Sequence, residues 1–486
     1  MKKLEWSQLL NSTRRKDLDN SASSISANVG GSRTEIERDY DRILFSTPVR
    51  RLADKTQVFP LEKNDSVRNR LTHSHEVSNL ARSVGVALMY GKNDLPKDDQ
   101  QKRDIPSMLA AIGLAHDIGN PPFGHQGEKA IGSWFKDKKI EVLDFKDSEE
   151  EVSSRIIERM EKDFLEFEGN AQAFRILTKL QLLNDQYGLN LTLGSLAALM
   201  KYPTTSEKTD TSKVSLKKFG CFHSELDCCK QVWKYTGLEL GVRHPLAYIM
   251  EACDDIAYSV LDVEDAIKKG LISYRDLINY LGKSTTENEL GEGDLLKRVI
   301  KKSEEKHEEH RQENLSPSEI NDISMQMFRV YAIHEMITSI TETFTSEYND
   351  IMSGEFKGDL IGNSKARIIC KRLKDFAFKN AYQTRSVLEL ELEGYIIIRS
   401  LMDMMWPAIK MRGDPITQKK HIGNPFERYV YGRISENYRR IFEDKDNTLP
   451  LNYKRCQLLA DMVSGMTDSF AIDFEAELAK LRISAN

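Results

Sequence analysis

The stretch AAIGLAHDIGNPPFGHQGE, residues 110–128, joins an apolar segment to a cluster of chemically versatile side chains. Its apolar start favours a short helix in a core. That helix ends on His116 and Asp117, two adjacent residues of the metal-ligand type. Glycines and prolines then break the helix and turn the chain sharply. We expect the turn to bring His125 and Glu128, three residues apart, back towards the pair and so to form the floor of an active site.

The His116 and Asp117 pair needs further donors, because neighbouring side chains on a helix point about 100° apart and supply two ligands at most. His73 lies near the start of one expected helix, and Asp254 lies within another, residues 245–265. Alone, His73 is more often a buried, hydrogen-bonded histidine, and His116 could be a helix-terminal residue. Taken together, two imidazoles and two carboxylates indicate a site for Mg²⁺, Mn²⁺, Co²⁺ or Zn²⁺.

The expected helix at residues 245–265 carries a second polar feature. Asp254, Tyr258 and Asp262 fall at positions i, i+4 and i+8 and therefore share one face. Asp255 is the rival ligand to Asp254, but it is out of step with the other two. We therefore assign Asp254 to the metal and give Asp255 a supporting or structural role.

Composition limits the class of protein. The 486 residues could form about three average domains or one large helical unit. A hydrophobic content of 40% and a charged content of 30% suit a globular protein, and a net charge of -5 argues against a chain devoted to nucleic acid. No signal peptide or membrane span is expected, so we expect a cytoplasmic protein. Six cysteines without CxxC spacing indicate reduced thiols, and no P-loop or GxGxxG fingerprint occurs.

At this point the residues resemble a known family. The order of His73, His116, Asp117 and Asp254 is similar to the H…HD…D signature of the HD-domain phosphohydrolases. More narrowly, four further segments resemble the bacterial deoxyguanosine triphosphate triphosphohydrolases: RRLADKTQVFPL (50–61), FEGNAQ (167–172), LAALMKYP (196–203) and SGMTD (464–468). The resemblance runs from about Tyr40 to about Ala471.

The resemblance implies a mainly α-helical HD-domain fold, a large single helical unit with peripheral helical insertions and few short strands. Within it we expect an HD phosphohydrolase core at residues 35–275 and a C-terminal helical region at 276–486 that completes the nucleotide pocket and the subunit contacts. Residues 11–33 are rich in Ser, Asn, Arg and Gly, so residues 1–34 are expected to be a mobile N-terminal arm. Residues 35–45 favour a short helix.

The resemblance also implies which residues act. One divalent ion per subunit, Mg²⁺ or Mn²⁺ before others, would be held by His73, His116, Asp117 and Asp254. His125 and Glu128 would be the catalytic pair, and a carboxylate one turn away can orient an imidazole for proton transfer. Whether this pair activates water or protonates the leaving group stays open, and a structural capping contact is the alternative. The positions implied to bind substrate are Gln57, Asn170, Lys201, Tyr202, Lys218, Tyr258, Asp262, Glu391 and Arg455.

Each of these positions has a chemical rationale and an ordinary alternative. Lysines suit a triphosphate of about four negative charges, although most lysines of the loop around Lys218 are expected to be only solubilising. A phenol such as Tyr258 against the deoxyribose would leave no room for a 2′-hydroxyl, and Asp262 could accept a hydrogen bond from the 3′-hydroxyl. Arg455 could serve a nucleotide within or between subunits, or simply end a helix.

The expected activity is hydrolysis of a deoxynucleoside triphosphate, dGTP first, to deoxynucleoside and tripolyphosphate by attack of water at the α-phosphorus. The resemblance also implies a homo-oligomer, a hexamer by precedent, with single-stranded DNA as an open effector. Two alternatives remain: another HD-type phosphohydrolase acting on a nucleoside monophosphate or cyclic nucleotide, and a nucleic-acid-binding regulatory protein with a degenerate site. The second alternative predicts a missing ligand, and none is missing here.

Overall fold

The computed structural model describes residues 3–19, 32–59, 64–91, 95, 98–145, 153–181, 185–283, 294–414 and 422–485. Over these residues the protein is mainly α-helical, which confirms the expected fold class. The expected short strands are reduced, in this described part, to two isolated bridges, Arg14 with Thr192 and Thr56 with Asn69. None of the described helices is both long and apolar enough to cross a bilayer.

The helices of the N-terminal half are α1 (Trp6–Leu9), α2 (Arg15–Asp19), α3 (Glu35–Leu44), α4 (Thr47–Arg51), α5 (Arg70–Tyr90), α6 (Asp99–Ala115), α7 (Gly124–Asp137), α8 (Lys139–Val142), α9 (Ser154–Leu165), α10 (Gly169–Arg175), α11 (Leu193–Leu199) and α12 (Leu226–Thr236). The later helices are α13 (Pro245–Lys268), α14 (Tyr274–Gly282), α15 (Asp294–His310), α16 (Pro317–Ser346), α17 (Tyr348–Ser353), α18 (Arg367–Ala377), α19 (Arg385–Lys410), α20 (Pro425–Arg433), α21 (Glu436–Phe442), α22 (Leu451–Ser464) and α23 (Asp468–Ala485). Short 3-10 turns lie at Leu52–Asp54, Ser206–Lys208, Val214–Leu216 and His223–Glu225, and π-helical turns lie at Ile176–Leu180 and Phe378–Tyr382.

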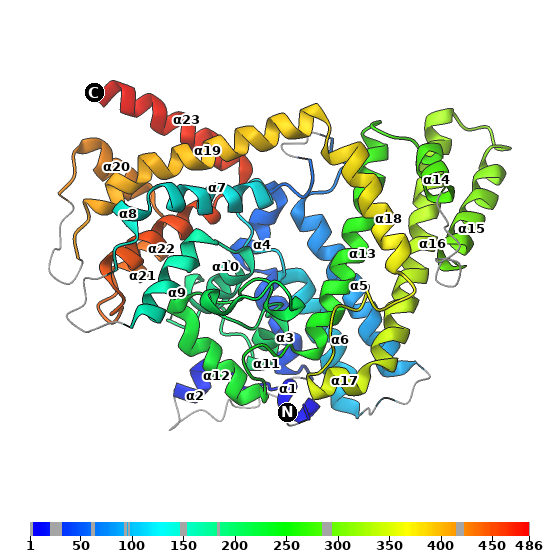
Figure 1. Ribbon diagram of the computed structural model, residues 1–486, viewed down its shortest axis with the longest axis horizontal. Coiled ribbons are helices and arrows are strands. Elements are labelled where there is room, and N and C mark those ends of the chain that lie inside the picture. Colours follow the sequence, from blue (N-terminus) through cyan, green and yellow to red (C-terminus); the bar gives the residue numbers. More distant parts are fainter. Residues whose placement is uncertain are drawn as a thin grey trace.

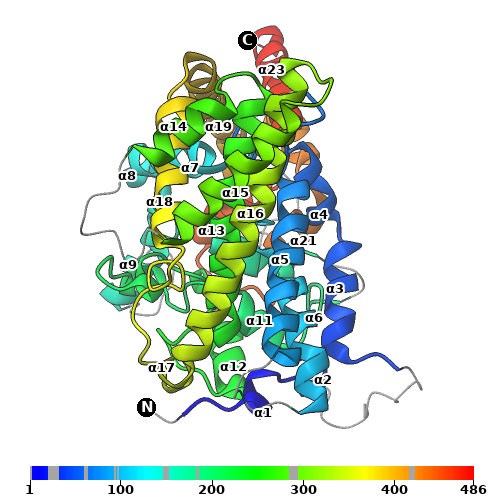
Figure 2. The same ribbon diagram turned by 90° about the vertical axis from the view of Figure 1, so that its right-hand side faces the viewer.

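Helices α5 and α6 run side by side and pack extensively against each other (Figure 2). A capping box at Asn69 starts α5, because its side chain accepts from the backbone N–H of Thr72 and the Thr72 hydroxyl accepts from that of Asn69. Gly113 of α6 lies against the backbone of Ser78 of α5, where a Cβ would come within 2.8 Å of Cα. The lack of a side chain at Gly113 therefore lets the helices that carry His73 and His116 approach closely.

Helix α13 packs on α5, α6, α16 and α18 (Figure 1). Its start is fixed by Pro245 in the first turn and by His244, whose Nδ1 accepts from the backbone N–H of Leu246 at 3.1 Å. The expected core positions, such as Ile249 and Ile256, are fully buried. The helix runs to Lys268, slightly beyond the expected end, and carries Asp254 on its way through the core.

The C-terminal third contributes a wall to the same unit. Helix α19 lies along α7 and also contacts α20, α22 and α23, as Figure 1 shows along the upper edge of the molecule. One cluster of buried apolar side chains extends from Leu4 to Leu478. Residues on both sides of position 275 therefore share a core, which agrees with one large helical unit.

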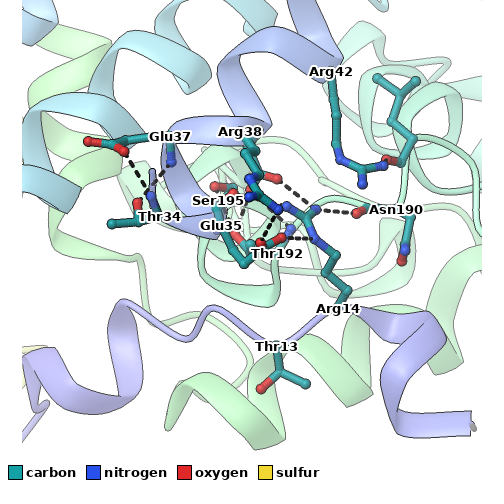
Figure 3. A network of polar contacts seen from close by, with 12 residues as sticks. Thr13, Arg14, Thr34, Glu35, Glu37, Arg38, Arg42, Asn190, Thr192 and Ser195 are labelled. Carbon is teal, nitrogen blue, oxygen red and sulfur yellow. Dashed lines mark hydrogen bonds and ion pairs between the residues drawn. The ribbon is translucent and has the colours of Figure 1, made fainter. Parts of the chain in front are cut away.

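The expected mobile arm at residues 1–34 is corrected for residues 3–19. Arg14 is 5% exposed, and its guanidinium binds Glu35 Oε2 and Asp39 Oδ1, each at 2.8 Å, and donates to the carbonyl of Asn190 (Figure 3). Trp6 is also buried. A guanidinium offers five donors and can satisfy several buried acceptors at once, which composition does not reveal. Residues 20–31 of the proposed arm lie outside the described residues.

Candidate active site

Donor atoms from three helices converge at the predicted metal site. The nitrogens of His73 (α5) and His116 (α6 C-cap) and a carboxylate oxygen of Asp117 all lie within 4.8 Å of one another. Asp254 approaches from α13, with Oδ1 3.1 Å from His73 Nε2 and 3.5 Å from His116 Nε2. The structure therefore brings together all four side chains that the sequence suggested.

The donor set fits a cation. His116 Nδ1 lies 2.7 Å from the carbonyl of Gly113, an arrangement that places the proton on Nδ1 and a lone pair on Nε2. That Nε2 is buried, and within the described residues it has no hydrogen-bond partner. Ligands about 2.1 Å from one ion lie about 3 to 3.5 Å from each other, which matches the spacing of Asp254 from the two rings. An ion among these atoms would satisfy the orphaned nitrogen.

The electrostatics of the cluster also favour a cation. Burial disfavours the imidazolium of His116, yet Asp117 and Asp254 outweigh this and raise its pKa to about 9 when no ion is bound. A divalent ion would take the place of the proton on Nε2. Burial likewise opposes ionisation of Asp117, but Arg70 and the two histidines lower its pKa to about 2. Against the same penalty, His116 and His73 hold the pKa of Asp254 well below its ordinary value. Both carboxylates are therefore ionised, as coordination of a metal requires.

Two residues that the sequence analysis missed orient Asp117. Arg70 Nη1 donates to Asp117 Oδ2 at 2.5 Å, and Asn120 Nδ2 donates to Asp117 Oδ1 at 2.6 Å. Arg70 stands three residues before His73 on α5, so helical spacing could have pointed to it. Asp255 pairs with Lys374 at 2.7 Å, in keeping with the structural role assigned to it.

A cavity of about 630 Å³ opens onto this cluster. Its wall includes the metal-site residues His116, Asp117 and Asp254, whereas His73 is only 1% exposed and lies behind them. Of the other predicted site residues, those that line the cavity are His125, Glu128, Gln57, Asn170, Lys201, Tyr202, Lys218, Tyr258 and Glu391. Residues from six segments of the chain, at 57, 116–128, 170, 201–218, 254–258 and 391, thus meet in one pocket.

The predicted catalytic pair lies in the first turns of α7. His125 Nδ1 is 3.0 Å from Glu128 Oε2, and the His125 side chain is 80% exposed. Glu128 Oε1 accepts from the backbone N–H of Gly169 at 2.9 Å. Burial opposes ionisation of Glu128, but the contact with His125 and the charge of Lys218 lower its pKa overall. The ionised Glu128 accepts a hydrogen bond from the Nδ1–H group of His125. Nε2 of His125 is then left to take up or release a proton.

The predicted phosphate-binding residues Lys201, Tyr202 and Lys218 all line the cavity, and both lysines are paired with carboxylates. Lys218 Nζ pairs with Glu168 Oε2 at 2.7 Å, and Lys201 Nζ lies 3.4 Å from Glu251 Oε1. Burial alone would lower the pKa of both lysines, but these carboxylates raise it, so both carry a positive charge. The acidic partners were not expected from the sequence. A polyphosphate would replace them as the counter-charge.

Arg243 contacts both Tyr202 and Glu251, the carboxylate partner of Lys201. Its side chain is fully buried and donates to Glu251 Oε2 at 2.6 Å, on the same carboxylate that faces Lys201. The guanidinium also stacks 5.5 Å from the centre of the Tyr202 ring. A buried arginine far from any motif carries no periodic signal, so it could not have been found in the sequence.

Asp262, predicted to contact the sugar of the substrate, is covered by another side chain. Asp262 is 2% exposed, does not line the cavity, and accepts a 2.5 Å hydrogen bond from the hydroxyl of Tyr382. Tyr382 lines the cavity beside Tyr258, with ring centres 6.1 Å apart. Helical spacing placed Asp262 on the correct face but could not show that a tyrosine 120 positions later covers it.

Arg455 lies away from this chain's pocket. It lies on α22 and donates to Asn452 Oδ1 and to the carbonyl of Lys410, each at 3.0 Å. It is absent from the cavity wall. A contact with the nucleotide of a neighbouring subunit stays a prediction.

Two further predicted site residues, Glu391 and Gln57, bring hydrogen-bonding groups to the cavity wall. Glu391 of α19 accepts from Gln126 Nε2 at 3.1 Å. Gln57 presents an Oε1 that is buried and, among the described residues, lacks a hydrogen-bond partner. Phe378 and Val387 also line the cavity, so its wall combines polar and apolar groups.

A mainly helical fold with this set of two histidines and two aspartates defines the class of HD-domain phosphohydrolases, and the HD domain family matches residues 70–189. Two relatives span almost the whole chain. The deoxyguanosinetriphosphate triphosphohydrolase-like proteins of Listeria monocytogenes serovar 1/2a (strain ATCC BAA-679 / EGD-e) and Listeria innocua serovar 6a (strain ATCC BAA-680 / CLIP 11262) are each 36% identical over 485 residues, 98% of this chain and 99% of theirs. This chain belongs to the deoxyguanosinetriphosphate triphosphohydrolase-like family of HD-domain proteins.

Proposed function

We propose that this protein hydrolyses deoxynucleoside triphosphates, dGTP first, to a deoxynucleoside and tripolyphosphate in a metal-dependent reaction. One observation carries the proposal: the cavity that opens onto the donors His116, Asp117 and Asp254 is also lined by the His125 and Glu128 pair and by two lysines, Lys201 and Lys218. A site for a cation, a group that moves protons and two cations for phosphates therefore share one pocket. Membership of the dGTPase-like family supports the choice of substrate.

Different residues of the site would bind the metal ion and transfer the proton. When bound among His73, His116, Asp117 and Asp254, a divalent cation would neutralise phosphate charge and acidify a water molecule. His125 Nε2 is the group in the cavity that can exchange a proton, because Glu128 holds Nδ1. It would either accept the proton of the attacking water or donate one to the departing 5′-oxygen. In either role the ionised Glu128 stabilises the imidazolium that forms.

Lys201, Tyr202 and Lys218 would hold the triphosphate. The pairing of both lysines with carboxylates keeps them charged and aimed into the cavity before substrate arrives. Preorganised charges cost little reorganisation during the reaction. Cleavage at the α-phosphorus would leave the three phosphates as one product, tripolyphosphate, held by these residues.

Selectivity for the deoxy sugar would come from Tyr258. Its ring lines the cavity and is braced by Tyr382, whose hydroxyl is committed to Asp262. A braced phenol leaves less room for a 2′-hydroxyl than a mobile one would. The sugar gate would then consist of Tyr258 with Tyr382 behind it, whereas Asp262 acts only through Tyr382.

The test is incubation of the purified protein and Mn²⁺ with each of the four deoxynucleoside triphosphates and with GTP, followed by chromatography of the products. The proposal predicts deoxynucleoside and tripolyphosphate, with dGTP consumed fastest and GTP slowly. Release of inorganic phosphate from a monophosphate, or of a linear nucleotide from a cyclic one, would favour the alternative HD-type activities. The homo-oligomer and the single-stranded DNA effector implied by the resemblance stay predictions, open to sizing and to a DNA titration against salt.

A further inference from the structure

The segment Ser464 to Asp468 resembles the family, yet none of its residues lines the cavity. Asp468, the first residue of α23, is 2% exposed and does not line the cavity. Its Oδ2 accepts from the backbone N–H of Thr56 at 2.9 Å and from the Thr56 hydroxyl, and its Oδ1 accepts from the backbone N–H of Phe123 at 3.0 Å. One buried carboxylate therefore joins three segments that are far apart in the chain.

The Phe123 contact leads to the catalytic pair. Phe123 has a φ of +59°, in the left-handed region that residues with side chains rarely adopt, and it is the N-cap of α7. His125 follows two residues later. Such a backbone conformation persists only where its surroundings fix it. The N–H acceptor supplied by Asp468 is one constraint, and α19 supplies the other, because a Cβ on Gly394 would come within 2.4 Å of the Phe123 ring.

The Thr56 contact leads to the metal site. The carbonyl of Thr56 accepts from Arg70 Nε at 2.9 Å, and Arg70 Nη1 in turn holds Asp117 Oδ2 at 2.5 Å. Lys55 ties together the same segments, since its Nζ donates to the carbonyls of Asn120 at 2.6 Å and Ser464 at 2.9 Å. Asp468 is thus the point where the support of Asp117 and the support of His125 meet.

We infer that Asp468 is a positioning residue that fixes the catalytic pair relative to the metal donors. The inference rests on the proposed function, since it assigns a geometry to that site. Asparagine in place of Asp468 has nearly the same shape but only one acceptor oxygen, so its amide would face either the Phe123 or the Thr56 N–H donor. Misplacement of a catalytic group by a fraction of an ångström to an ångström lowers turnover and leaves binding of substrate and metal largely intact.

The experiment compares Asp468→Asn with wild type and with Asp473→Asn, a change at an exposed residue of the same helix. Rates are measured with dGTP and with bis(p-nitrophenyl) phosphate, a chromogenic diester that needs only the metal and proton-transfer groups. Mn²⁺ affinity is measured by calorimetry, and the unfolding midpoint by circular dichroism. For Asp468→Asn we expect kcat to fall about 10- to 100-fold on both substrates, with KM and Mn²⁺ affinity within about twofold of wild type.

Gly394→Ala is the second variant, because it pushes on the Phe123 ring from the opposite side and should give the same separation of kcat from KM. The positioning role is overturned if folded Asp468→Asn and Gly394→Ala turn over at the wild-type rate. It is also overturned if kcat and metal affinity fall while KM rises to a similar extent. Were one variant to fail to fold, the other would decide. Wild-type protein that hydrolyses the chromogenic diester but not dGTP would count against the proposed substrate and not against Asp468.

Discussion

Asp254 Oδ1 lies 3.1 Å from Nε2 of His73, although 181 positions separate the two residues in the chain. Asp254 extends from the interior of α13 and His73 from the first turn of α5, and the two helices pack against each other. The contact costs desolvation of a carboxylate, and a cation shared with His116 and Asp117 is what would compensate for it. This arrangement leads to the following expectations.

Replacement of Asp254 by asparagine should weaken Mn²⁺ binding by about 10- to 100-fold, because an anionic ligand becomes neutral. Hydrolysis of nucleotide should fall to background. Calorimetric titration with Mn²⁺ measures the first effect. The neighbouring Asp255→Asn is the matched control, since Asp255 pairs with Lys374 and should leave metal affinity near wild type. Equal Mn²⁺ affinities in wild type and Asp254→Asn would refute the assignment of Asp254.

Replacement of Glu128 by glutamine should lower kcat by about 10²- to 10⁴-fold without a change in Mn²⁺ affinity, because the amide no longer stabilises a protonated His125. Steady-state kinetics with a metal titration separate the two quantities. Asp137→Asn, at the exposed far end of the same helix, should behave as wild type. Glu128 would be a capping residue only if the glutamine variant kept its turnover and lost thermal stability instead.

Replacement of Lys218 by alanine should raise KM for the triphosphate about 10- to 100-fold, the range of one charge-assisted contact of about 1.5–3 kcal/mol. Lys217→Ala removes an equal charge from an exposed neighbour and should change KM little. Initial-rate measurements at fixed ionic strength make the comparison. Should both variants raise KM equally, the lysines would act only through general attraction of the anion.

Stability should decline with acid because of His244. Burial lowers the pKa of this histidine to about 4, and its Nδ1 accepts a backbone hydrogen bond that a proton would abolish. Since the folded pKa lies below the unfolded value of about 6.5, the unfolded chain binds the extra proton, and stability is lost as pH falls from about 6.5 towards 4. Its share between pH 7.5 and pH 5 is about 2 kcal/mol.

Urea unfolding of wild type and His244→Gln at those two pH values measures this share, because glutamine keeps the polar contacts but does not titrate. The difference in unfolding free energy between pH 7.5 and pH 5 should be smaller in the variant. An identical pH dependence in both proteins would mean that other groups account for the acid sensitivity.

His73 and Asp254 could be proposed together from the sequence because each stands on a helix whose apolar face fixes its direction, and His116 and Asp117 follow where the apolar helix α6 ends. The turn after Asp117 could also be predicted from the sequence, because its glycines and prolines interrupt a helix. The sequence did not reveal which side chains cover a predicted site residue, or which charged groups pair with each other. Tyr382 hides Asp262, and Arg14 anchors a segment of disordered composition, through contacts between distant parts of the chain. Such contacts have no local pattern, so only the folded chain reveals them.

The central claim is that this protein directs water to the α-phosphorus of a deoxynucleoside triphosphate at the site formed by His73, His116, Asp117 and Asp254. The most direct measurement is hydrolysis of dGTP in H₂¹⁸O with Mn²⁺, followed by mass spectrometry of both products. The account predicts one ¹⁸O atom in tripolyphosphate, none in deoxyguanosine, and no reaction after removal of metal by chelation. Label in deoxyguanosine, or products that retain a phosphate on the nucleoside, would contradict it.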